Sequence, residues 1–445
     1  MFEIKSSKLA LDAISIYRKL LGDTVIKKLK TLLDYISGDE KQIAIVLNLY
    51  NDFFLSLAES EANSLEEYII DKIIFDENPF SKSVEKCKTG KKREFIKEAV
   101  HIDLENLQLL SRVNSKSIKN YLLNYFNESE FKYIIEKLPE WEAKCSELNT
   151  KDYPRHINVI KEKLSNANRW AESINALEAF HENYGSGAFA EYRAFVWERK
   201  DGKGYFKGVK KPDPVEIEEL IGYEVERSVI IENTEQFLNG FSGNNVLLHG
   251  DRGTGKSSTV KAILNKYYTK GLRMVEVPKA YLTDFPDIIR SLKDRTQRFI
   301  IFVDDLVFGD DEESYTALKA ILEGGLESKS SNILIYATSN RRHLVKEYFS
   351  ERAGSGNEEV HSGDSVQEKL SLADRFGINV VFSSPDQKKY LEIVDGIVAK
   401  RNMIIDKETL HSEAKKWEVW YNGRSARTAR QFVDWLEASV KTVKS

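Results

Sequence analysis

One short stretch, His249–Thr259 with the sequence HGDRGTGKSST, limits what this chain can fold into more than any other feature. It follows an apolar run that ends at Leu248 and precedes the helix-like run Val260–Leu264. Within it, Gly250–Ser257 matches the pattern G-x-x-x-x-G-K-[ST], in which a glycine-rich loop between a strand and a helix holds phosphate. The stretch predicts a parallel α/β sheet with a phosphate-binding loop at the carboxyl end of one strand.

The residue types in this loop explain how it would hold a nucleotide. Glycines let successive backbone N–H groups approach phosphate oxygens closely. Lys256 would bring a positive charge to the β- and γ-phosphates, and the hydroxyl of Ser257 would bind Mg²⁺. The residues expected to bind the phosphates are Gly250, Asp251, Arg252, Gly253, Thr254, Gly255, Lys256, Ser257 and Ser258.

A second strand supplies the carboxylates that such a loop requires. The apolar run Phe299–Val303 ends in Asp304 and Asp305, and ligands bind at the carboxyl ends of strands in open parallel sheets. We expect Asp304 to hold Mg²⁺ together with Ser257, and Asp305 to orient or deprotonate the attacking water. The acidic run Asp310–Glu313 is expected to be a solvated loop.

A third apolar run ends in a polar side chain that suits the same site. Residues Ile333–Thr338 are expected to form a buried strand, with Asn340 two residues beyond it. Its amide would hydrogen-bond to the γ-phosphate or to the attacking water. A plain turn asparagine is the alternative, and the other two motifs favour the functional role.

The hydrophobic pattern divides the chain of 445 residues. Residues 1–190 form a mostly helical N-terminal domain, expected to bind a partner or to direct assembly. Residues 191–214 are a connector, because the Lys211-Pro212-Asp213-Pro214 segment is stiff. Residues 215–384 form the α/β nucleotide-binding core, and residues 385–445 form a helical lid. Within the first domain, Ser64 and Glu67 have the spacing of a capping box, and 126–141 has a helical pattern.

The core alternates between short apolar runs and helical stretches, which predicts βαβ units and a parallel sheet. Residues 354–367 are rich in glycine and serine and are expected to be a mobile polar loop. From Ser384-Pro385-Asp386 onward the pattern is helical, and this triplet is a good helix start. The expected strands are Val246–His249, Met274–Val277, Phe299–Val303, Ile333–Thr338 and Val380–Ser383.

Taken in order, these motifs resemble those of AAA+ ATPases. In that class, the segment Leu220–Tyr223 would contact adenine, with Ile221 against the base. Leu372-Ala373-Asp374-Arg375-Phe376 is similar to an arginine-finger motif, which implies that Arg375 reaches the nucleotide of a neighbouring copy and that the chain forms a homo-oligomer. Gly423–Arg427 is similar to the sensor-2 turn of that class. The resemblance implies that Arg427 contacts the γ-phosphate, and Arg430 is the second candidate for this role. A surface ion pair with the adjacent Asp374 is the alternative for Arg375.

Three segments resemble, more closely, a bacterial family of AAA+ proteins known only as domain of unknown function 815. They are Gly243–Gly250, Ala337–Leu344 and Arg424–Phe432. The resemblance implies a fold and an activity class, but no substrate. Arg341 and Arg342, in the second segment, would contact a partner or an adjacent nucleotide, or would be solvated, which is slightly favoured.

One departure from the pattern of AAA+ motors affects the expected rate. Many of them have Asp-Glu where this chain has Asp304-Asp305. Because the side chain of Asp305 is shorter, it would sit farther from the attacking water. We therefore expect slow hydrolysis that depends on a partner for stimulation.

Composition sets limits on partners and location. The net charge of −4 gives no overall attraction to nucleic acid or to an anionic membrane. Two distant cysteines, Cys87 and Cys145, indicate a reducing compartment. No run of about 18 apolar residues is present, as a membrane span requires, and the N-terminus has no signal-peptide pattern. We expect a cytoplasmic protein without membrane contact.

Three functional alternatives remain at this point. The chain could be an ATPase that remodels a protein partner, an ATP-dependent switch or loader associated with DNA or a nucleoprotein, or a scaffold whose ATP site is mainly structural. The guanine signature Asn-Lys-x-Asp is absent, which favours ATP over GTP. Tyr192, Phe195 and Trp197 could stack nucleic-acid bases, but a core role is favoured for them.

Overall fold

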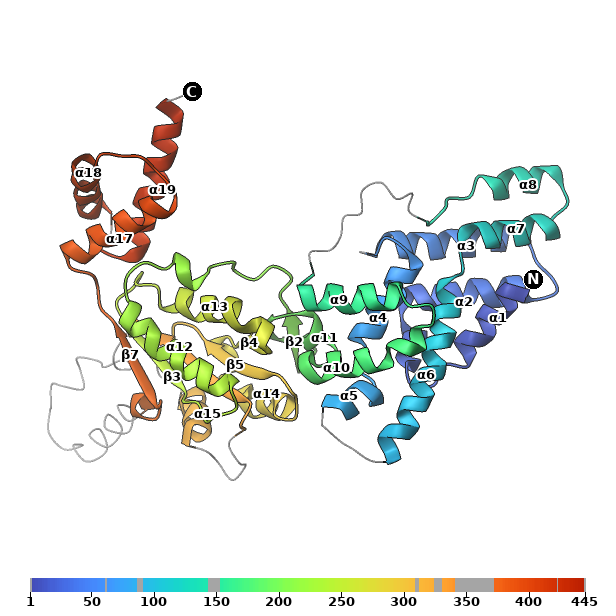
Figure 1. Cartoon of the computed structure of the whole chain (residues 1–445), viewed down its shortest axis with the longest axis horizontal. Helices are drawn as coiled ribbons and strands as arrows, with labels where there is room; N and C mark the ends of the chain where they lie inside the picture. Colours follow the sequence, from blue (N-terminus) through green and yellow to red (C-terminus); the bar gives the residue numbers. More distant parts are fainter. Residues whose placement is uncertain are drawn as a thin grey trace. The chain divides into compact units, whose positions relative to one another are not determined.

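The structure is a computed structural model that describes residues 2–60, 62–85, 91–142, 153–308, 312–323, 330–340, 372–421 and 423–443. The chain divides into two compact units, Met1–Glu191 and Tyr192–Ser445. The first is helical and the second contains the sheet and the C-terminal helices (Figure 1). Two segments with sequence expectations, 354–367 and Arg341–Arg342, lie outside the described residues, as do Cys87 and Cys145.

The N-terminal unit consists of helices packed around one apolar core. Its α-helices are α1 (Phe2–Asp12), α2 (Thr24–Ser37), α3 (Ile43–Ala58), α4 (Leu65–Phe75), α5 (Pro79–Glu85), α6 (Lys91–Ser111), α7 (Ser115–Tyr125), α8 (Ser129–Glu136), α9 (Arg155–Ser165), α10 (Ile174–Tyr184) and α11 (Ala188–Glu191). The helix expected over 126–141 is shorter than predicted, since only α8 is helical in this range. Pro139 cannot continue a helix, because it has no backbone N–H to donate. Trp141 instead packs against Tyr50 and Phe53, with ring centroids 5.3 and 5.1 Å away.

The helix start expected at Ser64 is confirmed in part. The Ser64 hydroxyl accepts a hydrogen bond from the N–H of Glu67 at 3.0 Å. The carboxylate of Glu67 does not return to Ser64, and accepts instead from the backbone N–H of Asn63 at 3.0 Å. The return bond is therefore shifted by one residue, and the other carboxylate oxygen of Glu67 accepts from a lysine of another helix.

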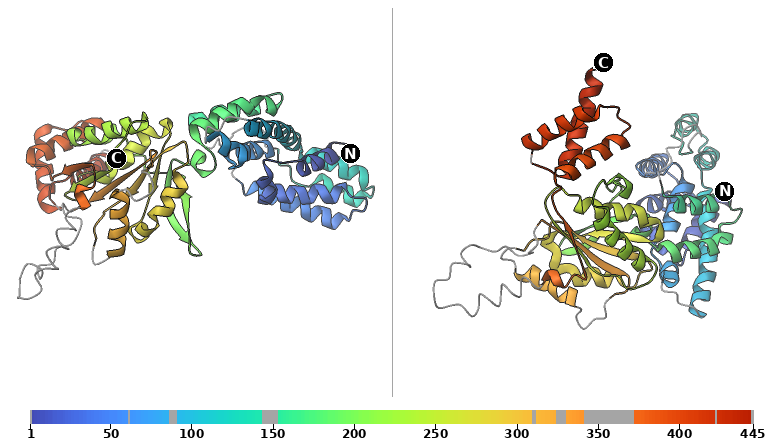
Figure 2. Two further views of the ribbon diagram at one scale, coloured as in Figure 1. Left: turned by 90° about the horizontal axis from the view of Figure 1, so that it is seen from below. Right: turned by 60° about the vertical axis from the view of Figure 1, so that its left-hand side comes forward.

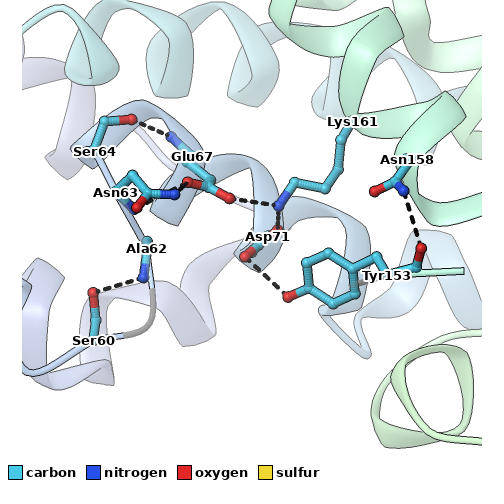
Figure 3. A network of polar contacts seen from close by, with 9 residues as sticks. All are labelled: Ser60, Ala62, Asn63, Ser64, Glu67, Asp71, Tyr153, Asn158 and Lys161. Atoms are coloured by element: carbon cyan, nitrogen blue, oxygen red, sulfur yellow. Dashed lines mark hydrogen bonds and ion pairs between the residues drawn. The ribbon is translucent and has the colours of Figure 1, made fainter. Parts of the chain in front are cut away.

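That lysine belongs to a polar network inside the helical unit (Figure 3). The ammonium of Lys161 in α9 lies 3.0 Å from the carboxylate of Glu67 and 2.7 Å from that of Asp71, both in α4. The ring of Tyr153 covers the ammonium at 4.6 Å, and its hydroxyl donates to Asp71 at 3.3 Å. The Lys161 side chain is only 15% exposed, so the network joins α4 to α9 largely away from water.

Replacing Lys161 with alanine is expected to destabilise the chain by about 3 kcal/mol, because two half-buried carboxylates would lose their counter-ion. Burial tends to raise the pKa of Glu67, but the N–H of Asn63 and the Lys161 ammonium hold it below its usual value. The stabilisation is therefore complete above the pKa of the unfolded chain, about 4.3, and is lost as pH falls through the lower folded pKa. Urea denaturation of the full chain at several pH values measures both effects.

The matched control is Lys163→Ala, two residues along the same helix, where the side chain is exposed. It is expected to change the stability by less than about 0.5 kcal/mol. Equal losses for the two variants would contradict a specific role for the network.

The second unit is built on a seven-stranded sheet with the order β2-β1-β4-β5-β6-β3-β7. All neighbouring strands are parallel except β1 and β2. The strands are β1 (Ala194–Lys200), β2 (Lys203–Gly208), β3 (Val246–Gly250), β4 (Leu272–Glu276), β5 (Arg298–Val303), β6 (Ile333–Ser339) and β7 (Ile378–Phe382). All five expected strands are confirmed, each with ends within two residues of the expected ones.

The connector expected over 191–214 is wrong for most of its length. Residues 194–208 form the hairpin β1–β2, and β1 pairs in parallel with β4. Phe195 and Trp197 are buried, and the indole of Trp197 donates to Asp284 at 2.8 Å. The turn at Asp201–Gly202 has positive φ at both residues, as a tight hairpin requires. Phe195 and Trp197 therefore belong to the core, which is the role that the sequence favours over the stacking of nucleic-acid bases.

Helices cover both faces of the sheet (Figures 1 and 2). Because side chains alternate along a strand, Val246 and Leu248 of β3 join the same apolar cluster as residues of α12 and α13. Leu247, between them, points to the opposite face of the sheet and is fully buried. The helices are α12 (Glu224–Leu238), α13 (Lys256–Tyr267), α14 (Phe285–Leu292) and α15 (Glu312–Glu323).

Three helices follow β7: α17 (Gln387–Lys400), α18 (Lys407–Trp420) and α19 (Ala426–Val443), red in Figure 1. The helix start expected at Ser384-Pro385-Asp386 is confirmed, since the carboxylate of Asp386 accepts from the N–H of Lys389 at 2.7 Å. Helix α15 begins at Glu312, so the acidic run is not a loop at Glu312 and Glu313; Asp310 and Asp311 lie outside the described residues. Among the described helices, none has the length and apolar content needed to cross a membrane.

Candidate functional site

The glycine-rich loop connects β3 to α13 in the second unit. Gly250 has φ of 128°, and an added Cβ would lie 2.3 Å from the carbonyl oxygen of Phe382. Gly255, at the helix N-cap, has φ of 96°, and an added Cβ there would meet nothing within 4 Å. Gly250 is therefore required by the neighbouring strand, whereas Gly255 is required by its left-handed backbone. This backbone turns the loop towards the N-terminus of α13, where anions are stabilised.

Lys256 is the first residue of α13 and is 6% exposed. Its ammonium donates to the carbonyl oxygens of Gly250 and Asp251, at 3.0 and 2.6 Å. Burial lowers its pKa, while the nearby carboxylates of Asp251, Asp304 and Asp305 act in the opposite direction. The ammonium is thus held over the loop, at the position where a phosphate group would be bound.

Ser257 and Asp304 meet as the sequence predicts. The Ser257 hydroxyl donates to Asp304 Oδ1 at 2.7 Å, and the hydroxyl of Thr338 donates to the same oxygen. A hydroxyl and a carboxylate are oxygen donors of the kind that Mg²⁺ prefers. These residues therefore fit a magnesium ion bound next to a nucleotide phosphate.

Asp305 is held in an unusual conformation beside Asp304. Its φ is 51°, a left-handed value that aspartate adopts more readily than most residues. Its N–H donates to the Thr338 hydroxyl at 2.9 Å, and its carboxylate accepts from the amide of Asn340 at 2.7 Å. The ammonium of Lys279 is 3.7 Å away. Asp305 and Asn340 are thus brought together as one polar pair.

A single pocket collects most of the predicted residues. The described residues that line it are Glu219, Leu220, Ile221, Arg227, Arg252, Gly253, Thr254, Gly255, Lys256, Ser257, Ser258, Asp304, Asp305, Thr338, Asn340, Ile393, Ile397, Lys400, Arg401, Ala426, Arg427 and Arg430. Seven of these side chains are basic and three are acidic, a balance that suits an anionic ligand.

Several lining residues were missed by sequence reasoning. Ile393 and Ile397 lie one turn apart on α17, and their apolar spacing was a signal that could have found them. Thr338 lies two residues before Asn340, so the alternation of side chains near the end of β6 could have indicated it. Lys400 and Arg227 have no local signal, because only the folded chain brings them to the pocket.

The C-terminal helices contact the loop directly. The N–H of Arg427, at the start of α19, donates to the carbonyl oxygen of Gly253 at 3.0 Å. The side chains of Arg427 and Arg430 are exposed and line the pocket. A guanidinium is thus available on the lid side, opposite the residues of the sheet.

Two predicted residues have other contacts. The carboxylate of Asp251 accepts from the N–H of Ser384 at 2.6 Å, and neither Asp251 nor Gly250 lines the pocket. Arg375 lies outside the pocket lining and bonds to the carboxylate of Glu323 at 2.6 Å. Within this chain Arg375 therefore forms an ion pair with Glu323, whereas the alternative considered from the sequence was a pair with the adjacent Asp374.

The loop between β3 and α13, the carboxylates after β5 and the helical lid after β7 together define an AAA+ P-loop nucleotide-binding fold, preceded by a helical unit. More narrowly, the chain belongs to the family described as "Protein of unknown function (DUF815)", whose model matches residues 190–440. The resemblance to this family that was read from the sequence is confirmed.

Solved structures of low sequence identity are also similar to this chain. The RuvB Holliday junction branch migration motor of Thermotoga maritima is 18% identical, with a TM-score of 0.36, over 52% of this chain and 67% of that one. The AMPPCP-bound DnaA of Aquifex aeolicus is 16% identical, with a TM-score of 0.35, over 50% and 65%. The search of curated proteins finds no match.

Proposed function

We propose that this chain binds ATP with Mg²⁺ and hydrolyses it slowly, to drive the remodelling or regulated assembly of a protein partner. The observation that carries this proposal is the convergence of Lys256, Ser257, Asp304 and Asp305 in one basic pocket. Lys256 and Ser257 belong to the phosphate loop, and Asp304 and Asp305 follow the end of β5. These are the positions from which side chains can bind a phosphate group and Mg²⁺. The apolar side of the pocket, with Ile221 and Ile393, suits the base.

In this mechanism the chain supplies positioning and charge. The ammonium of Lys256 binds the β- and γ-phosphate oxygens. Ser257 and Asp304 would hold Mg²⁺, which would supply positive charge to stabilise the phosphate oxygens. Asp305, kept in place by Asn340, orients the attacking water and accepts its proton. Arg427 stabilises the negative charge that develops on the transferred group.

Hydrolysis by the isolated protein is expected to be slow. The carboxylate of Asp305 is on a short side chain and is engaged by Asn340 and Lys279. A partner that shifts this pair towards the water would raise the rate. The test is phosphate release by the purified wild-type protein, with Mg²⁺ and with EDTA; no Mg²⁺-dependent release above the background of a Lys256→Ala sample would contradict the proposal.

We also propose that Arg375 acts on the nucleotide of a second copy. This requires Arg375 to exchange its bond with Glu323 for a phosphate contact. The Asp305→Asn protein, which should hold ATP without hydrolysing it, is expected to assemble when ATP is added. Light scattering after size exclusion measures its molar mass with and without ATP. A monomer in both states, with ATP binding verified, would refute the role of Arg375 between copies.

The other functions make different predictions. A switch or loader would bind its partner in one nucleotide state without repeated turnover. A scaffold would keep its partner after Lys256→Ala. Association with DNA has no support from the aromatics of β1, because Phe195 and Trp197 are buried.

A further inference from the structure

A single peptide group at the junction between sheet and lid is held from two sides. It joins Ser383 to Ser384, directly after β7 and two residues before the N-cap of α17. Its N–H donates to the carboxylate of Asp251 at 2.6 Å. Its carbonyl oxygen accepts from the hydroxyl of Tyr223 at 2.6 Å. Both hydrogen-bonding positions of this peptide are thus taken by side chains distant in sequence.

The two side chains belong to two chain segments that also contribute residues to the pocket, although neither side chain lines it. Asp251 is the second residue of the phosphate loop, and its carbonyl oxygen also accepts from Lys256 at 2.6 Å. Tyr223 lies two residues after Ile221, which lines the pocket together with Leu220. The junction peptide is therefore hydrogen-bonded to one residue from each of these two segments.

The contact with Asp251 is firm. Its own N–H donates to the carbonyl oxygen of Phe382 at 2.9 Å, so the loop is bound to the junction at two points. The N–H of Ser384 holds the pKa of the Asp251 carboxyl below its usual value. The carboxylate is thus charged at neutral pH, and hydrogen bonds to charged groups are the stronger ones.

The contact with Tyr223 is equally constrained. The residue is 2% exposed and has φ of 63°, a left-handed value that is uncommon for an aromatic residue. Its ring lies 5.3 Å from that of Phe382, and the ammonium of Lys389 in α17 lies over it at 4.2 Å. Tyr223 therefore touches the last residue of β7 and the first turn of the lid at once.

We propose that Asp251 and Tyr223 are positioning residues that clamp the Ser383–Ser384 peptide and so couple occupancy of the pocket to the orientation of the lid. The inference rests on the proposed ATP binding. When Lys256 moves from the loop carbonyls to a phosphate, the loop around Asp251 readjusts and the junction follows. Because the lid carries Arg427 and Arg430, its orientation decides whether a guanidinium reaches the γ-phosphate.

The test compares Asp251→Ala, Asp251→Asn and Tyr223→Phe with the wild-type chain. Binding of mant-ADP, steady-state ATP turnover and hydrogen exchange of α17–α19 with and without ATP are measured. Asp251→Ala is expected to lower kcat about tenfold and Tyr223→Phe about threefold, while KM changes less than threefold. A larger change in kcat than in KM is expected, because the clamp acts on the closing of the lid and not on the initial binding of ATP.

Hydrogen exchange of the lid amides distinguishes a positioning role from a purely structural one. A residue with only a structural role would not change the response of these amides to ATP. ATP is expected to protect the lid amides in the wild-type chain, and this response should be lost in Asp251→Ala and restored at least by half in Asp251→Asn, which keeps an acceptor oxygen. The matched control for the hydroxyl is Tyr205→Phe, which removes a bond to Glu198 on the hairpin. It should leave kcat and lid protection unchanged.

The failures can be told apart. If the wild-type chain binds no nucleotide, the proposed function fails and the clamp fails with it. If it binds and hydrolyses ATP while Asp251→Ala and Tyr223→Phe keep full kcat and full ATP-dependent lid protection, only the clamp is overturned. Should Asp251→Ala not fold, Tyr223→Phe, which removes one oxygen atom, decides by the same criteria.

Discussion

Replacing Lys256 with alanine is expected to lower ATP affinity at least about 100-fold and to remove detectable turnover. The ammonium would make two bonds to charged phosphate oxygens, and such bonds contribute about 1.5–3 kcal/mol each. A loss of about 3 kcal/mol corresponds to about 100-fold in affinity. Isothermal titration with ATP and Mg²⁺ measures the affinity, and phosphate release measures turnover.

The matched control is Lys261→Ala in the same helix, where the side chain is 38% exposed and its ammonium lies 3.6 Å from Asp213. It should bind ATP within about twofold of the wild-type chain. Circular dichroism must show that Lys256→Ala is folded, since Lys256 also bonds to two loop carbonyls. A folded Lys256→Ala protein with wild-type ATP affinity would refute the assignment of the loop.

The second large effect is expected from Asp305→Asn, which should reduce turnover about 100-fold and leave ATP affinity within about threefold. Removing a general base typically costs 10²–10⁴-fold in rate. The substitution keeps a side-chain oxygen for the Asn340 amide, and asparagine tolerates the left-handed backbone at this position. Single-turnover hydrolysis with protein in excess over ATP separates the chemical step from binding.

The control for this prediction is Asp287→Asn in α14, whose carboxylate is exposed and paired with Arg290. It should leave both affinity and rate unchanged. If Asp305→Asn hydrolyses ATP at the wild-type rate, Asp305 is not the residue that activates the water, and the expected slow turnover needs another explanation.

The central part of the site could be predicted from the sequence because its signals are local. The phosphate loop is one continuous pattern, and Asp304, Asp305 and Asn340 each follow an apolar strand. Parallel strands end at the same edge of the sheet, so their terminal side chains must converge. The contact between Ser257 and Asp304 was expected on this ground.

The rest of the site depends on tertiary contacts that no local pattern encodes. The bond from Ser384 to Asp251 joins residues 133 positions apart; sequence reasoning could only assign Asp251 to the phosphates with its neighbours. Pro212 and Pro214 favour a connector over 191–214, whereas residues 194–208 form a hairpin whose glycines and lysines obscure the alternation of its aromatics. The Asp201-Gly202 turn was the signal for it.

Nucleotide binding by the wild-type chain is the most direct test of the account. Isothermal titration of the full chain with ATP, with and without Mg²⁺, and with GTP for comparison, measures it. The account predicts saturable binding of one ATP per chain, tighter with Mg²⁺ and weaker for GTP. A folded wild-type chain that shows no saturable binding of ATP in the presence of Mg²⁺ would contradict it.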